Sequence, residues 1–70
     1  MTTDTLGDAL PREMARVRDE VLPAYVQIGA AGEIAATLMR LDLDRAAQAM
    51  AAGDTVAMIA LYQSLKEWSL

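Results

Sequence analysis

Some of the side chains that most often perform catalysis are missing from this sequence, and the others have no suitable partner near them in the sequence. Histidine and cysteine are absent, which leaves ten carboxylates as the groups that could act as a general acid or base. Asp42 and Asp44 are near one another in sequence, but two residues apart on a helix they point in nearly opposite directions. Ser64, Ser69 and Lys66 have no base close by in the sequence to activate them as nucleophiles. We therefore expect no catalytic site and interpret the carboxylates as solvated surface charges.

Binding sites for metals and cofactors are not expected either. Structural zinc sites use Cys and His, and this chain has neither. The segment Gly29-Ala30-Ala31-Gly32 lacks the lysine and the preceding strand of a phosphate-binding loop. Without disulfides or a metal, a chain of 70 residues must be stabilised by close helix packing or by a second subunit.

The charge and hydropathy of the chain argue against two further classes of partner. Its formal net charge is −4, with six basic and ten acidic residues, whereas proteins that bind nucleic acids cluster Lys and Arg. No apolar stretch approaches the ~20 residues of a membrane span, and no basic segment followed by an apolar run marks a secretory signal. We expect a cytoplasmic protein that binds neither nucleic acid nor membrane.

Any functional side chains must be positioned by helices, and the first of these is predicted over residues 9–28. Asp8 is a suitable N-cap and Pro11 falls in the first turn, so the polar residues 1–7 are expected to form a flexible leader ahead of one helical domain, 8–70. Pro23 predicts a kink, because the helical spacing of apolar residues continues past it. These residues are Leu10, Met14, Val17, Val21, Ala24, Tyr25 and Ile28.

Two more helices are predicted over 33–52 and 55–68, separated by turns at 29–32 and at Gly53-Asp54. The middle helix has two apolar faces, and we expect both to be covered by neighbouring helices. One face holds Ile34, Leu38 and Leu41, and the other holds Met39, Leu43, Ala46 and Met50. The last helix gathers Met58, Leu61, Tyr62, Leu65 and Trp68 on one face. No segment alternates with the period of a strand, so the sequence predicts an all-α, three-helix bundle.

Arg45 is unexpected because it follows Ile34, Leu38 and Leu41 on a face predicted to be buried. One interpretation is that its stem packs while its head reaches solvent or pairs with Asp42. The other is that it anchors a protein interface. Trp68 has a similar ambiguity, since large aromatic residues serve both in cores and at interface hot spots.

Three segments resemble small uncharacterised helical proteins of bacterial phages and prophages. They are Ala9-Leu10-Pro11-Arg12-Glu13-Met14-Ala15-Arg16-Val17-Arg18, Ile28-Gly29-Ala30-Ala31-Gly32 and Gly53-Asp54-Thr55-Val56-Ala57-Met58-Ile59. The resemblance identifies no active residue. It implies a small, acidic accessory protein that acts on a host or phage protein, in the manner of an inhibitor.

Two functions remain open from the sequence. The first is a protein–protein interaction module, an accessory or inhibitory protein that binds a bacterial protein. The alternative is an obligate homo-oligomer, such as a homodimer, that completes its core by self-association. For either partner, self or foreign, we predict an interface where the C-terminal turn meets the region of Pro23. Its predicted residues are Tyr25, Ile28, Arg45, Leu65 and Trp68.

Overall fold

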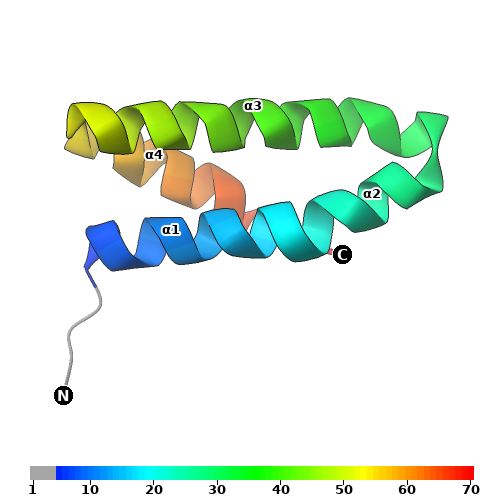
Figure 1. Cartoon of the computed structure of the whole chain (residues 1–70), viewed down its shortest axis with the longest axis horizontal. Coiled ribbons are helices and arrows are strands. Elements are labelled where there is room, and N and C mark those ends of the chain that lie inside the picture. The colour runs from blue at the N-terminus through cyan, green and yellow to red at the C-terminus, as the bar shows by residue number, and fades with distance from the viewer. Residues whose placement is uncertain (1–4) are drawn as a thin grey trace, which may run out of the picture.

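The computed structural model describes residues 5–70, which form three helical segments that run in alternating directions (Figure 1). The first segment is continuous through α1 (Leu6–Arg16), the π-helical turn η1 (Val17–Val21) and α2 (Leu22–Ile28). It is followed by α3 (Ala30–Ala52) and α4 (Thr55–Lys66), and none of the described residues lies in a strand. The predicted all-α, three-helix bundle is confirmed.

The first helix begins at Leu6, because Thr5 is its N-cap. The hydroxyl oxygen of Thr5 accepts a hydrogen bond from the backbone N–H of Asp8 at 3.2 Å, and the hydroxyl donates to the Asp8 carboxylate at 2.9 Å. Asp8 therefore lies in the first turn, where a negative charge is favourable. The prediction that Asp8 is the cap, and that the leader extends to residue 7, is wrong; residues 1–4 of that leader lie outside the described residues.

Where a kink is predicted at Pro23, the structure has a π-helical turn just ahead of the proline. The N–H of Leu22 donates to the carbonyl of Val17, five residues back, so this turn is wider than an α-helical one. Proline lacks an N–H, and its ring collides with the carbonyl four residues earlier in a regular helix. The wider turn makes room for the ring of Pro23, which then occupies the first turn of α2. Beyond it, α2 rises toward the start of α3 (Figure 1).

The connection between α2 and α3 is a single residue, Gly29, which has a φ of 88°. The turn predicted over 29–32 is therefore too long, and α3 begins at Ala30. Gly32 lies inside α3 and is buried, because the helices cross there so closely that a Cβ on it would be 1.9 Å from the carbonyl oxygen of Tyr25. The second turn is confirmed: Gly53 is left-handed, with φ 66°, and Asp54 caps α4 by accepting from the N–H of Ala57.

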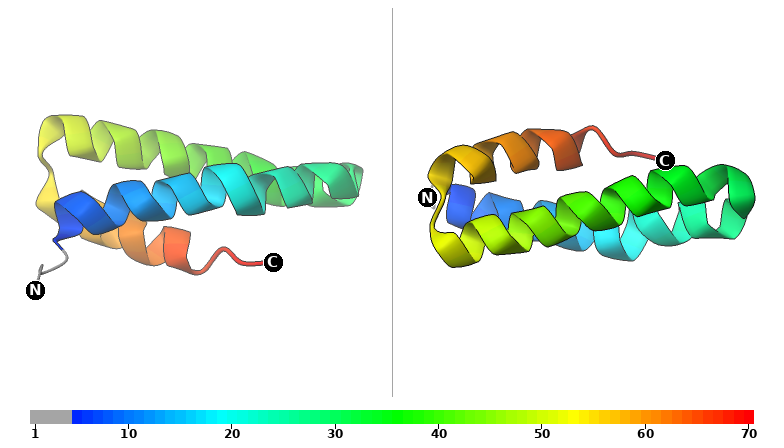
Figure 2. Two further views of the ribbon diagram at one scale, coloured as in Figure 1. Left: turned by 60° about the horizontal axis from the view of Figure 1, so that its bottom comes forward. Right: turned by 90° about the horizontal axis from the view of Figure 1, so that it is seen from above.

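The core lies where the first segment, α3 and α4 meet. Its largest fully buried side chains are Leu10, Val17, Val21, Met39 and Leu65, in agreement with the predicted stripes of the first and last helices. On α3 only the face of Met39 and Ala46 is packed. The prediction that both apolar faces of this helix are covered is wrong, because the first segment and α4 lie on the same side of it (Figures 1 and 2).

Candidate protein-binding surface

The uncovered face of α3 carries a row of large apolar side chains. Ile34, Leu38 and Leu41 are 75%, 48% and 41% exposed. At spacings of four and three residues they lie on one side of the helix, and Arg45 continues the row four residues later. We call these four residues the α3 stripe. Neighbouring exposed apolar side chains of this kind often mark a site where another protein binds.

The exposure along the stripe follows the length of α4. The hydroxyl of Ser64, in the last turn of α4, contacts Asp42 of α3, so α4 ends beside the middle of its longer neighbour. The hairpin of α2 and α3 extends well past this point (Figure 2). Ile34, which lies in the extended part, is the most exposed of the three apolar residues. Ile28, in the last turn of α2, is also 61% exposed.

Arg45 is exposed and makes no hydrogen bond or ion pair with another described residue. Of the two positions expected for its head, solvent or Asp42, the pairing with Asp42 is not formed, and the carboxylate instead binds donors from α4 and the C-terminal turn. Asp42 accepts a hydrogen bond from the Ser64 hydroxyl at 2.7 Å and from the indole N–H of Trp68 at 3.1 Å. The role of Arg45 as an interface anchor stays a prediction.

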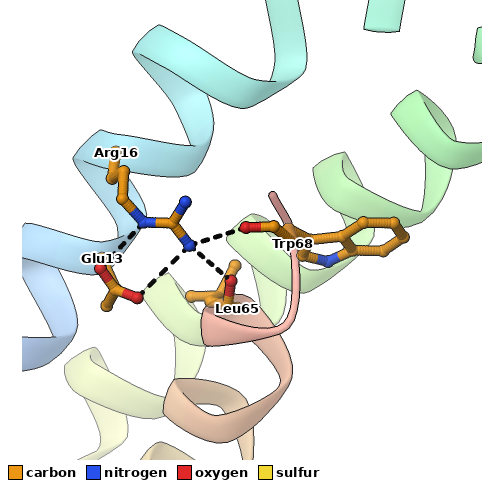
Figure 3. A network of polar contacts seen from close by, with 4 residues as sticks. All are labelled: Glu13, Arg16, Leu65 and Trp68. Atoms are coloured by element: carbon orange, nitrogen blue, oxygen red, sulfur yellow. Dashed lines mark hydrogen bonds and ion pairs between the residues drawn. The ribbon is translucent and has the colours of Figure 1, made fainter. Parts of the chain in front are cut away.

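A second polar cluster fastens the C-terminal turn to the first helical segment. Arg16 donates from Nη2 to the carbonyls of Leu65 at 3.0 Å and Trp68 at 2.8 Å, while Glu13 holds its guanidinium at 3.1 Å (Figure 3). A cation beside the C-terminal end of a helix interacts favourably with the helix dipole and can bind its last carbonyls, and Arg16 does so at the end of α4. Tyr25 adds a hydrogen bond from its hydroxyl to the carbonyl of Ser69 at 3.1 Å. We call these contacts, together with those of Asp42, the C-terminal clasp.

The structure brings some residues of the predicted interface together at the clasp, but it places one of them in the core. The C-terminal turn does meet the region of Tyr25, as expected from the sequence. Leu65, however, is fully buried in the core, so its assignment to an interface is wrong. Tyr25 and Trp68 are half-buried, and their polar atoms bind within the chain, whereas Ile28 and Arg45 are exposed. The candidate apolar surface is therefore the α3 stripe and not the C-terminal turn where it was predicted.

Sequence reasoning missed Asp42 and Arg16, which both bind residues far away along the chain. A local signal for Asp42 was present. It lies three residues after Met39 and four before Ala46, which places it at the edge of the buried face of α3. Ser64 and Trp68 are four residues apart and share one side of the C-terminal segment, so one carboxylate reaches both.

The other charged side chains of residues 5–70 lie on the surface. Two hydrogen bonds from Arg18, at 2.9 and 3.0 Å, hold the pKa of the Asp19 carboxyl below its ordinary value and raise the pKa of Arg18. Both side chains are well exposed, and ion pairs of this kind contribute little to stability. Among residues 5–70 there is no pocket and no cluster of three potential metal ligands. None of the helices in that range is long and apolar enough to cross a membrane.

Replacing Asp42 by alanine tests the clasp. We expect Asp42→Ala to lower the free energy of unfolding by about 1–2 kcal/mol, because it leaves the Ser64 hydroxyl and the Trp68 indole N–H unpaired at a half-buried site. Asp44→Ala is the matched control, since Asp44 is exposed and binds only Gln48, and it should change stability by less than about 0.5 kcal/mol. Urea denaturation followed by fluorescence of Trp68, the single tryptophan, measures both. Equal effects of the two variants would contradict the clasp.

Comparison of the chain with protein families, curated proteins and solved structures gave no match. The predicted relation to phage accessory proteins therefore stays a prediction.

Proposed function

We propose that this protein is a protein–protein interaction module that binds through the α3 stripe. The observation that carries the proposal is the exposure of Ile34, Leu38 and Leu41 at helical spacing on the longest helix. Covering each of these side chains stabilises a complex by up to about 1.5–3 kcal/mol when burial is complete, less in proportion where part is already covered.

The form of the stripe fits a partner helix better than a small molecule. Helical partners are recognised by apolar anchors at spacings of three and four residues, which is the spacing of the stripe. Small molecules bind in concave sites, and the described residues form no pocket. Arg45 supports the same proposal, because Arg is enriched among residues that dominate interface energies and this one has no partner among the described residues.

The sequence gives less support to catalysis. It contains no histidine and no cysteine, and its only lysine, Lys66, lies over the ring of Tyr62 at 5.3 Å from the ring centre. Among residues 5–70 the carboxylates are on the surface, apart from Glu13, which pairs with Arg16, and Asp42, which accepts hydrogen bonds from neutral donors within the clasp. We therefore propose binding as the function and place it on α3.

Photo-crosslinking from α3 tests this proposal. A photoreactive amino acid replaces Leu38 in the stripe or, as the matched control, Ala47, which is exposed on the same helix but off the stripe. In an extract of the cells that express the protein, we expect position 38 to form several-fold more adducts with protein, either a second copy or another chain. Excess unlabelled protein should suppress these adducts, whereas an excess of the Leu41→Glu variant should not.

The competition makes the test specific, because a non-specific apolar contact would respond equally to both competitors. Circular dichroism must show that Leu41→Glu is folded, as expected for a residue already 41% exposed. Equal adduct yields from positions 38 and 47, or equal suppression by both competitors, would overturn the proposal.

A further inference from the structure

We infer that the partner of the α3 stripe is the α3 stripe of a second copy of this chain, packed antiparallel about a two-fold axis. The inference rests on the proposed function and names the partner of the same surface. It depends on the spacing of the stripe, on its charges and on the end point of α4.

The spacing of the stripe is the same in both directions. Ile34, Leu38, Leu41 and Arg45 are separated by four, three and four residues. A two-fold axis between positions 39 and 40 therefore places Leu38 opposite Leu41 of the second copy, and Ile34 opposite its Arg45. Such an interface uses one patch twice and closes at two subunits, as in the commonest homodimers.

The charges select the antiparallel arrangement over the parallel one. Parallel packing would set the two Arg45 side chains against one another. Antiparallel packing separates the two Arg45 positions by about 16 Å along the helix, which exceeds the screening length of about 8–10 Å in ordinary salt. It also brings each Arg45 to the level of Ile34, beside Glu33 of the other copy.

Glu33 is available to a second cation. Its ion pair with Arg40 is long, at 3.9 Å, and both side chains are 52% exposed. Arg45 has no partner within the described chain. The dimer thus pairs a free cation with a weakly bound carboxylate twice, while the centre of the contact, Leu38 on Leu41, is apolar.

The end point of α4 makes the two copies complementary in shape. Because α4 ends beside Asp42, it flanks only the C-terminal half of α3. The N-terminal half packs against α2 but has no counterpart of α4 beside it. The two-fold rotation carries the α4 of each copy toward this half of the other copy's α3. Ile34, the most exposed apolar residue of the stripe, gains cover in this way. A chain too short for a large core, without disulfides, gains stability from such a second subunit.

Reversing the charges tests the dimer and its direction. We expect the purified chain to be a dimer in sedimentation equilibrium over a concentration series. Arg45→Glu should raise the dissociation constant about tenfold, because each copy then opposes Glu33 with a like charge, and Glu33→Arg should do the same. The double variant should return to within about threefold of the original protein. Glu20→Arg, which reverses an exposed charge on the first helical segment and not on α3, is the control and should leave the dissociation constant within about threefold.

Each other outcome overturns the inference. A protein that stays monomeric at millimolar concentration has no such dimer, although crosslinks from position 38 to a foreign protein would still uphold the proposed function. A dimer that the single reversals weaken but the double reversal does not restore is not antiparallel through α3. A dimer that Leu38→Glu leaves intact, with the variant folded by circular dichroism, uses another face.

Discussion

Gly32→Ala should lower the free energy of unfolding by about 3 kcal/mol, at or beyond the upper end of the usual cost of overpacking by one methyl group. The added Cβ would be 1.9 Å from the carbonyl oxygen of Tyr25 and 2.9 Å from its carbonyl carbon. These are backbone atoms that cannot rotate away, so α2 and α3 must move apart. Urea denaturation monitored by circular dichroism measures the loss.

A second helical glycine provides the control. Gly7 lies in α1, and a Cβ there would meet only the side-chain oxygen of Thr5, at an ordinary 3.7 Å. Since alanine is the better helix former, Gly7→Ala should stabilise the protein by about 0.5–1 kcal/mol. The two substitutions add the same methyl group and are expected to act in opposite directions. If Gly32→Ala also stabilised the protein, the close crossing of α2 and α3 would be wrong.

Met39→Ala should lower the free energy of unfolding by a comparably large amount, whereas Leu38→Ala, at the neighbouring position, should not. Met39 is fully buried in the core, and truncating a buried side chain of this size costs about 2–5 kcal/mol. Leu38 lies in the α3 stripe and is 48% exposed, so Leu38→Ala should cost less than about 1 kcal/mol in the monomer. Denaturation at high dilution, where self-association is absent, measures both variants.

The two adjacent residues decide which face of α3 is the core. If Leu38→Ala cost more than Met39→Ala, the helix would be turned the other way and the stripe would be buried. A dimer adds a further signature. Raising the protein concentration should stabilise the original chain more than the Leu38→Ala variant, because association stabilises the folded state by mass action.

The three helices could be predicted from the sequence because their determinants are local. Gly53 and Asp54 end one helix and cap the next through contacts within a few residues, and the apolar spacing of the first and last helices has one dominant face. The start of α1 was missed even though Thr5 and Asp8 have the spacing of a capping box. Asp8 is itself a good cap, so two acceptable local solutions competed there.

The face of α3 that forms the core could not be predicted in this way. Its two apolar faces have similar side chains, and periodicity shows that both are apolar without showing how many neighbours the helix has. Gly32 presents the same difficulty, since a glycine near another glycine suits a turn as well as a close helix contact. The distance from Gly32 to the backbone of Tyr25 becomes known only when two helices are placed together.

The candidate site could be predicted only in part, because some of its features depend on contacts between segments that are far apart in the sequence. The meeting of the C-terminal turn with Tyr25 follows from the order of the helices and is confirmed by the hydrogen bond to Ser69. The burial of Leu65 and the occupation of Asp42 depend on contacts between segments more than 20 residues apart. The α3 stripe was present in the sequence but was assigned to the core, because exposing that much apolar surface is unfavourable for an isolated monomer.

The central claim is that the α3 stripe is left bare by its own chain and is covered by a protein. The rate of thiol modification at Leu38→Cys tests both parts, since the natural chain has no cysteine to interfere. At high dilution we predict that the thiol reacts as fast as an exposed one, while the Met39→Cys thiol on the buried face is protected. As the concentration of the protein is raised, or cell extract is added, the reaction at position 38 should slow. A thiol at position 38 that is protected at every dilution, or one whose rate never responds to other protein, would contradict the claim.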